Sequence, residues 1–208
     1  IKYIEYIDSS KLNDFDFGSY KRVAKLYPSH VIFFLNSHSH PIKKNWLKII
    51  LKHYRNNTIL GTTASYESAF SSLRLKKFYK IISYMFRFYK FKNTFKAFPN
   101  PHIRTSGFLI KGSDFISFIK NKKINNKVDA WSIESGLNGL TNFFKKKKYN
   151  IFVVNSDGVK FTENSWKLSE TYIYLKQSKS LISDKHSRKY LKLSARDKLY
   201  SSNISWGE

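Results

Sequence analysis

Short apolar runs that alternate with longer amphipathic segments constrain this chain more than any other feature of its sequence. Residues 31–35 read VIFFL, residues 58–64 read TILGTTA and residues 150–154 read NIFVV, which are typical of buried strands. Before the first of these runs and between the first two, residues 16–27 and 41–54 place apolar side chains at helical spacing. Strands that alternate with helices predict an α/β fold with a mainly parallel sheet flanked by helices.

Periodicity and capping residues predict the remaining elements. Pro41 suits the first turn of the 41–54 helix, and Ser113 is placed to cap another helix. We expect the apolar face of the 41–54 helix to consist of Ile42, Trp46, Ile49, Ile50 and His53. The other predicted elements are strands at 3–7 and 102–110 and helices at 113–121 and, interrupted by Gly136 and Gly139, within 129–149.

The length of 208 residues and the hydrophobic content of 41% suit a single domain with a sizeable core over 1–208. The pattern weakens after Asp157 and Gly158, so we expect 159–208 to be a weakly structured C-terminal segment. The chain opens inside the strand-like run IKYIEYID without an initiator Met. We therefore expect a fragment that lacks its natural N-terminus.

The formal net charge of +24 is compatible with binding to nucleic acid or to an anionic membrane. The 38 basic residues comprise 31 Lys and 7 Arg, however, and Asn and Ile are also plentiful, as in proteins from AT-rich genomes. Phosphate recognition more often uses the forked guanidinium of Arg. The chain has no cysteine and no apolar run long enough to span a bilayer, which favours a cytoplasmic protein without disulfides or thiolate metal sites.

The stretch NSHSH follows the buried strand 31–35 directly, at residues 36–40. In α/β sheets, ligands bind beyond the carboxyl ends of the strands. Backbone N–H groups, hydroxyls or imidazoles of this loop are therefore candidates for ligand contacts. The alternative is a loop whose two histidines simply face solvent.

Several motifs together resemble those of the bacterial GT-A-type glycosyltransferases similar to family 2. DFDFGSYKRVAKLYPSHVIFFLNSHSHPIKKNWLKIIL, followed by ILGTTASYES, resembles the donor-site half, and NPHIRTSGFLI, DAWSIESGLNGLT and VVNSDG resemble the acceptor side. The resemblance covers roughly residues 2–190. It implies transfer of a sugar from a nucleotide sugar to a glycan or lipid-linked acceptor of surface polysaccharide synthesis, with inversion. It also implies that the nucleobase-binding strand lies upstream of Ile1.

This chain departs from the resembling enzymes at the positions of their metal-binding motif. Where they carry carboxylates for Mg²⁺ or Mn²⁺, this chain has Ser37, His38 and Ser39. Hard cations prefer charged oxygen ligands. Three hypotheses follow: transfer without metal, with His38, His40 and nearby cations neutralising the diphosphate; a softer divalent ion bound through the imidazole of His38; or an inactive transferase-like scaffold.

The resemblance also assigns candidate roles. Glu134 is the expected general base, with Gly136 leaving room beside it for a bound sugar, and Asp129 is the alternative. A helix-surface role is the ordinary alternative for Glu134. The expected donor contacts are Asp16, Gly18, Asn36, Ser37, His38, Ser39, His40, Arg104 and Arg188, with Asp184 or Asp157 orienting the cations. The two arginines are chosen because arginine is scarce in this chain and its forked guanidinium suits a phosphate, and a surface salt bridge is the ordinary alternative for each. The expected acceptor contacts are Tyr66, Glu67, Ser68, Thr105, Ser106, Gly107, Trp131 and Asp157, and Trp131 and Trp166 are candidates for stacking on a sugar or for core packing.

Residues 73–98 contain eight basic and no acidic residues, interleaved with aromatics. This composition would also suit a nucleic-acid-binding protein, the main alternative to a transferase. Phe78, Ile81, Ile82, Met85, Phe88 and Tyr89 recur at helical spacing. They predict a helix that lies on an anionic membrane, at the inner face of the bilayer, or packs as ordinary core. The run KKKK at 145–148 is interpreted as a solvated turn.

Overall fold

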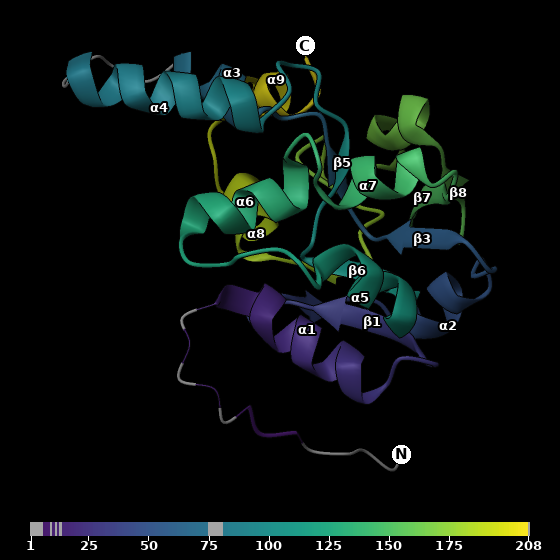
Figure 1. The fold of residues 1–208 in the computed structure, drawn as a ribbon. Coiled ribbons are helices and arrows are strands. Elements are labelled where there is room, and N and C mark those ends of the chain that lie inside the picture. Colours follow the sequence, from purple (N-terminus) through teal and green to yellow (C-terminus); the bar gives the residue numbers. More distant parts are fainter. Residues whose placement is uncertain (1–5, 9, 11, 13, 75–80, 208) are drawn as a thin grey trace.

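The computed structural model describes residues 6–8, 10, 12, 14–74 and 81–207. Its centre is a five-stranded sheet (Figure 1). In spatial order the strands are β1 (Val31–Leu35), β6 (Gly107–Lys111), β3 (Thr58–Gly61), β7 (Asn150–Val154) and β8 (Lys160–Phe161). The α/β class is confirmed.

The predicted mainly parallel arrangement of the sheet is wrong. Only β3 and β7 are parallel, whereas β6 runs antiparallel to both β1 and β3, and β8 runs antiparallel to β7. The cause lies in the long connection between β3 and β6. This connection leaves and re-enters the sheet at the same end, so the chain must run back through β6 in the opposite direction.

Two small sheets and ten helical segments surround the main sheet in the described part of the chain. β2 (His40–Pro41) pairs with β9 (Ile182–Ser183), and β4 (Ala64–Ser65) pairs with β5 (His102–Ile103). The helices are α1 (Phe15–Leu26), α2 (Trp46–Leu51), α3 (Ala69–Arg74), α4 (Ile81–Thr94), α5 (Gly112–Ile119), α6 (Lys127–Ser135), α7 (Leu140–Lys146), the 3₁₀ helix η1 (Glu163–Ser169), α8 (Lys185–Leu191) and α9 (Ala195–Trp206).

Two predicted helix starts are wrong. Pro41 lies in β2, and α2 begins only at Trp46 because Asn45 has a φ of 57°, a left-handed conformation that interrupts a helix. The predicted face of the 41–54 helix is correspondingly reduced to Ile50, which is buried, with Trp46 and Ile49 packed beside it. The cap of α5 is the extended backbone of Lys111, not the side chain of Ser113.

The main sheet is covered on both faces, as the alternation along its strands requires. Phe34, Phe108 and Val153 point into a cluster with residues of α1, α5 and α7. Their neighbours Leu109 and Val154 point to the other face, where they meet Ile50 of α2 and the segment around Leu181. The continuous apolar runs in the sequence are explained by this double coverage.

A third cluster lies away from the sheet, where α3 and α4 pack together against α6. Phe70 and Leu73 of α3 and Phe91 of α4, with Phe95 just beyond, form its buried part. Trp131 of α6 packs against it. Figure 1 shows α4 projecting from the body of the fold beside α3 and α9.

The segment 159–208 differs from the expected weak structure, because it contains β8, η1, β9, α8 and α9. Trp166, Tyr190 and Trp206 bring it into the main core, and the Trp206 indole N–H donates to the Tyr172 carbonyl over 3.0 Å. A few large aromatic side chains anchor this otherwise polar segment, so its sequence shows no regular apolar pattern that would predict its helices and strands. The predicted strand 3–7 lies mostly outside the described residues. Among the helices of the described chain, none combines the length and apolarity needed to cross a bilayer.

Candidate functional site

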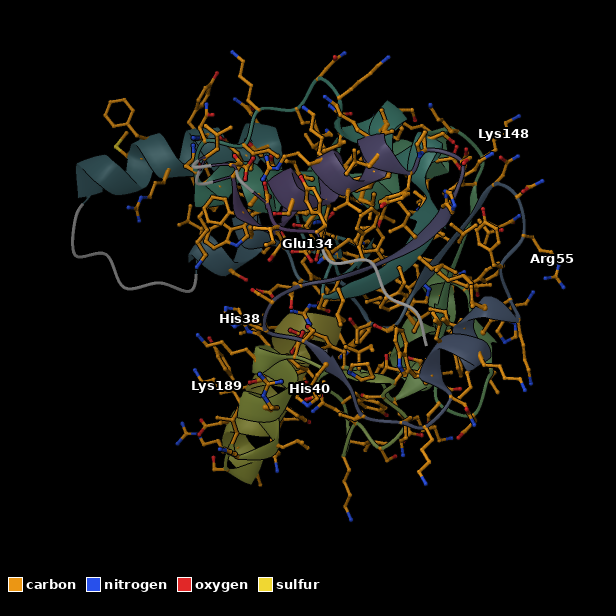
Figure 2. The ribbon with its side chains drawn as sticks, turned by 90° about the horizontal axis from the view of Figure 1, so that it is seen from below. His38, His40, Arg55, Glu134, Lys148 and Lys189 are labelled. Carbon is orange, nitrogen blue, oxygen red and sulfur yellow. The ribbon has the colours of Figure 1, made fainter. Side chains whose placement is uncertain are left out.

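Loops from distant parts of the sequence meet at one end of the main sheet. The register places Leu35 opposite Gly107 and Gly61 opposite Phe108, and β7 runs parallel to β3. The segments 36–40, 62–63, 104–106 and 155–158 therefore emerge together, and we call them the loop end of the sheet. Arg55 and Lys148, which precede β3 and β7, lie at the opposite end, away from His38, His40 and Glu134 (Figure 2).

The donor-loop candidates 36–40 form a compact turn. The Asn36 side-chain oxygen accepts from the His38 amide at 3.1 Å and from the Ser39 hydroxyl at 2.6 Å. Asn36 and Ser39 thus use these groups to hold the turn. His38 and His40 are exposed, and Ser37 approaches Asp16 of α1, with its Oγ 3.5 Å from the carboxylate. The turn shapes the loop so that the two imidazoles face outward.

Arg188 lies against this loop although it is separated from it by about 150 residues of sequence. Its Nη2 donates to the His38 carbonyl over 3.0 Å, and its Nη1 lies 3.4 Å from His40 Nδ1. The pairing of β2 with β9 and the first turn of α8 bring it there, since His40 is the register partner of Ser183. The structure therefore brings the predicted donor residues His38, His40 and Arg188 together.

Arg104 has a different position from the one expected for a direct phosphate contact. Its guanidinium forms an ion pair with Asp184 and lies 3.9 Å from the centre of the Tyr172 ring. The side chains of Arg104 and Asp184 are only 13% and 5% exposed. Burial alone would raise the pKa of Asp184, but Arg104 and the Ser187 amide outweigh it and hold that pKa below its usual value. Arg104 is thus already neutralised, and it fixes the segment around it.

Glu134 points from α6 to the start of β6. Its Oε1 accepts from the Thr105 amide at 2.7 Å and from the Thr105 hydroxyl at 3.0 Å. Glu134 is half-buried. Burial raises the pKa of the Tyr20 phenol, and the nearby carboxylates of Asp16 and Glu134 raise it further. Glu134 and Asp16 therefore act on the same buried group, and Thr105 holds Glu134 at the loop end.

Asp129 and Gly136 serve α6 itself. Asp129 accepts from the Asn125 amide and the Asn126 side chain, both at 3.0 Å, and so closes the turn before the helix. Gly136 ends the helix, and a Cβ there would lie 2.5 Å from the Ser132 carbonyl oxygen. The expectation that Gly136 leaves room for a sugar is wrong, because the backbone of its own helix fills that space.

The two tryptophans proposed for sugar stacking are committed to packing. Trp166 is fully buried in the main core, and its indole N–H donates to the Phe161 carbonyl. Trp131 packs against the α3–α4 cluster, with Lys127 Nζ 5.4 Å from its ring centre. Neither ring is therefore placed to stack on a ligand at the loop end.

Most of the other acceptor candidates also hold the fold. The Tyr66 hydroxyl donates to the Glu163 carbonyl, the Ser68 hydroxyl donates to the Lys96 carbonyl over 2.6 Å, and Ser106 bonds to Thr63. Gly107 allows close crossing of strands, since a Cβ would lie 2.8 Å from the Thr62 hydroxyl oxygen.

Two acceptor candidates, Glu67 and Asp157, have carboxylates accessible to solvent, whereas the donor candidate Gly18 is required by the fold. Glu67 is half-buried, with an oxygen 3.4 Å from the Ser72 hydroxyl. Asp157 is exposed and pairs with Lys179 at 3.2 Å. Gly18 is buried, and a Cβ there would lie 1.8 Å from the carboxyl carbon of Asp14, which leaves no room for a side chain. Of these three, only the two carboxylates remain candidates for a contact with substrate.

A buried network behind Glu134 was missed at the level of sequence. His102 Nδ1 donates to the Asn100 carbonyl over 2.8 Å, and the Asn100 side chain donates to the Ser135 carbonyl over 2.7 Å. Burial lowers the pKa of His102, which favours its neutral form. Asn100 and His102 lie within NPHIRTSG, so that motif could have identified them as functional candidates. Tyr172, the ring beside Arg104, was also missed, because it lies in the polar C-terminal part of the sequence, where no pattern marks it.

No family model, curated protein or solved structure matches this chain.

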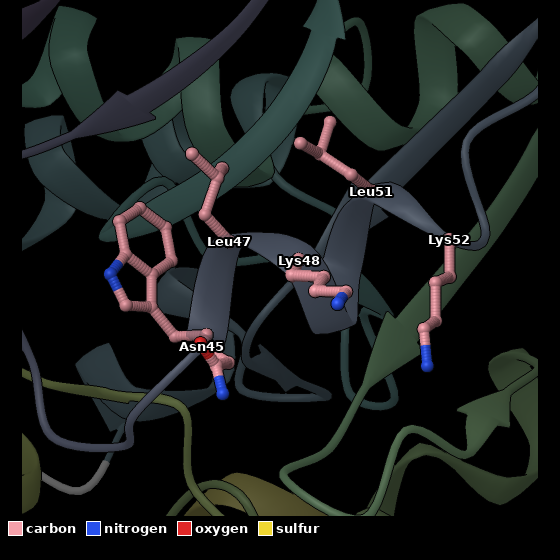
Figure 3. Close-up of a pocket in the computed structure, with 6 residues that line it drawn as sticks. Asn45, Leu47, Lys48, Leu51 and Lys52 are labelled. Carbon is pink, nitrogen blue, oxygen red and sulfur yellow. The ribbon is translucent and has the colours of Figure 1, made fainter. Parts of the chain in front are cut away.

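Two surface pockets lie apart from this arrangement. One, of about 630 Å³, is lined by α2 and Asn45 and contains none of the predicted site residues (Figure 3). The other, of about 500 Å³, lies along α1 and shares only Gly18 with them. The loop end is therefore a candidate because of its convergent polar groups rather than because of a deep cavity.

The loop 36–40 by itself does not offer the ligands that a hard divalent cation prefers. The loop 36–40 supplies imidazoles and hydroxyls, and the Asp16 carboxylate lies beside it, 3.5 Å from Ser37 Oγ. Within that same part, no three His, Asp or Glu side chains form a group that could hold a metal ion. Hard cations need several charged or carbonyl oxygens.

Proposed function

We propose that this protein is a glycosyltransferase that moves a sugar from a nucleotide sugar to a glycan or lipid-linked acceptor in surface polysaccharide synthesis. The observation that carries the proposal is the convergence at the loop end. A carboxylate held by Thr105 and a histidine-containing loop held by Arg188 come together from segments far apart in sequence. The motifs that resemble GT-A-type glycosyltransferases of family 2 supply the reaction class.

Glu134 is the proposed general base. Both of its donors use Oε1, so Oε2 is the oxygen to which the acceptor hydroxyl gives its proton. The acceptor oxygen then bonds to the anomeric carbon. The bond from that carbon to the diphosphate breaks, and its electron pair leaves with the nucleoside diphosphate. A positioned base of this kind accounts for about 10²–10⁴ in rate.

The leaving diphosphate is proposed to lie over the loop 36–40. His38, His40 and Arg188 offer imidazole and guanidinium N–H groups there. Charge-assisted hydrogen bonds to phosphate oxygens are stronger than neutral ones, and they stabilise the charge that develops as the bond breaks. The imidazoles and hydroxyls of the loop 36–40 do not suit a hard cation. For this reason, the proposal contains no step that requires a metal ion.

The finer fold and the location belong to the same proposal. In the GT-A-like interpretation, β1 is the strand that leads into the donor loop 36–40. Catalysis would take place in the cytoplasm, at the inner face of the membrane, where nucleotide sugars and lipid-linked acceptors meet.

Binding of nucleoside diphosphates tests the proposal directly. A thermal-shift screen with the common nucleoside diphosphates should raise the Tm with at least one of them, because a ligand at about 100 times its Kd adds about 2.7 kcal/mol of stability. Arg188→Gln should reduce the shift. Arg55→Gln, an exposed arginine at the opposite end of the sheet, should leave it unchanged.

The same screen should include a single-stranded oligonucleotide at two salt concentrations. Tight, salt-dependent oligonucleotide binding without any response to nucleoside diphosphates would identify a nucleic-acid-binding protein instead. Binding of the diphosphate without transfer to any acceptor would identify the inactive scaffold.

A further inference from the structure

The helix α4 divides its apolar side chains between two faces. Phe91 is buried and Phe88 half-buried, and both belong to the cluster with α3. Since each residue turns a helix by 100°, Phe86 and Tyr89 lie on the side away from Phe91 and Phe95. This differs from the face expected from sequence, which combined Met85, Phe88 and Tyr89 in one stripe. Of the other members of that stripe, Phe78 lies outside the described residues.

We define the outer face of α4 as the exposed residues Met85, Phe86, Tyr89 and Lys90, together with Arg87 at its edge, and this face combines apolar and cationic side chains. Met85, Phe86 and Tyr89 are 64%, 76% and 71% exposed. Arg87 and Lys90 are exposed beside them. Scattered exposed apolar residues are normal, but these three large ones lie close together on a helix that projects from the fold (Figure 1). Such a patch favours a partner.

Along the chain, the charge next to this face has one sign. From Ser68 to Ser113 the sequence contains no Asp or Glu, so Glu67 and Asp114 are the nearest acidic residues along the chain. Lys92 and Lys96, both exposed, extend the positive region beyond Arg87 and Lys90. An apolar strip flanked by cations complements an interface of acyl chains and anionic headgroups.

We propose that the outer face of α4 binds an anionic lipid surface, with Met85, Phe86 and Tyr89 inserted among the lipids. A second copy of the chain fits less well, because pairing two such faces would bring Arg87 and Lys90 against like charges without an acidic partner. Lipid headgroups supply the missing negative charge and, beneath it, an apolar phase. The inference rests on α4 alone and can fail while the proposed function holds.

The position of α4 gives such binding a structural consequence. Val128 and Trp131 of α6 pack against the α3–α4 cluster, and α6 also carries Glu134. The Leu137 amide just beyond α6 donates to the Thr94 carbonyl at the end of α4 over 2.9 Å. Docking through α4 would therefore place the loop end at a fixed height above the membrane.

Vesicle co-sedimentation tests the inference with phosphatidylcholine alone and with phosphatidylcholine mixed with anionic phosphatidylglycerol. Binding should require the anionic lipid and weaken at high salt, because salt screens charges that remain in water. The variants M85S/F86S/Y89S and R87E/K90E should each lower the partition coefficient by about tenfold or more. Their Tm should stay close to that of the parent protein, because the changed side chains are exposed.

The helix α2 provides matched controls. Its Leu47 and Leu51 are 40% and 43% exposed, and Lys48 and Lys52 lie beside them (Figure 3). L47S/L51S and K48E/K52E make comparable changes in apolarity and charge, and they should alter the partition coefficient less than about twofold. If the α2 variants lowered the partition coefficient more than the α4 variants did, the proposal would be overturned.

Three further results would also overturn it. They are equal recovery on neutral and anionic vesicles, absence of binding to both, and self-association in solution that the α4 variants abolish without any binding to vesicles. Binding of a single-stranded oligonucleotide that depends on the same five residues, with no vesicle binding, would assign this face to nucleic acid.

Discussion

Arg104 at the loop end and Arg87 on α4 carry the same guanidinium in opposite surroundings. Arg104 is buried between the Asp184 carboxylate and the Tyr172 ring. Arg87 is exposed on a helix whose neighbouring residues are apolar or basic. A buried charge must have a fixed partner because its desolvation is costly, whereas an exposed charge keeps its hydration until a partner arrives.

The comparison separates two kinds of surface in one protein. At the loop end, Asp184, Thr105 and Asn36 hold charged or polar groups in one geometry, as a site that must position reacting atoms requires. On α4, the exposed side chains have geometry imposed only by the helix, which suits a partner without defined shape such as a lipid surface. Substitutions should therefore change stability or activity more at the loop end than on α4. Within the loop end, the effect should be larger for the more buried side chains.

The largest effect is expected from Asp184→Ala. This change leaves the buried Arg104 without its partner and should lower the free energy of unfolding by about 3–5 kcal/mol. Urea denaturation followed by circular dichroism measures it. The matched control is Lys145→Ala, which breaks the more exposed pair with Glu163 and should cost about 0–1 kcal/mol.

Acid titration sharpens this prediction. Because the folded-state pKa of Asp184 is lowered, its contribution is fully present above the unfolded value of about 3.9 and is lost as the pH falls through the lower folded value. The stability difference between the parent protein and Asp184→Asn should therefore shrink below about pH 4. Equal losses for the Asp184 and Lys145 variants at neutral pH would break the contrast between buried and exposed charges.

The second effect concerns Glu134, which is half-buried. Glu134→Gln keeps its shape but removes its basicity, so sugar transfer should fall by about 10²-fold or more while nucleoside diphosphate binding barely changes. The control is Asp129→Asn on the same helix, whose carboxylate only closes the preceding turn. A radiolabelled-sugar transfer assay compares the two. Transfer by Glu134→Gln within a few-fold of the parent rate would rule out Glu134 as the base.

The smallest of these effects is expected from His38, the most exposed of the three groups. His38→Ala should weaken nucleoside diphosphate binding by about 1–2 kcal/mol through the loss of one hydrogen bond. His30→Ala is the control, because His30 is also exposed but precedes β1 at the opposite end of the sheet. Titration calorimetry measures both.

Chelation provides a separate check on the same loop. Transfer should persist in EDTA, because the donor set of residues 36–40 does not suit Mg²⁺ or Mn²⁺. Complete loss of transfer in EDTA, restored by either ion, would mean that carboxylates from elsewhere in the chain or phosphate oxygens of the substrate complete a metal site at the loop.

The local pattern of the sequence determined the elements whose burial is regular. The runs 31–35 and 150–154 became β1 and β7, and the region 16–27 became α1 with a shift of one residue at each end. Glu134 was correctly placed on a helix, and Gly136 and Gly139 correctly mark the break between α6 and α7. Periodicity succeeds in these cases because it reports which side of each segment is apolar.

Tertiary structure alone decided which segments meet. It reversed β6, drew Pro41 into a strand with β9, gave Arg104 a partner 80 residues away and turned Phe86 to the outside of α4. The direction of a strand depends on where the preceding connection re-enters the sheet, and the state of a charge depends on the group packed against it. Neither quantity is a property of a residue and its near neighbours, and for this reason the sequence named the residues of the loop end but not their contacts.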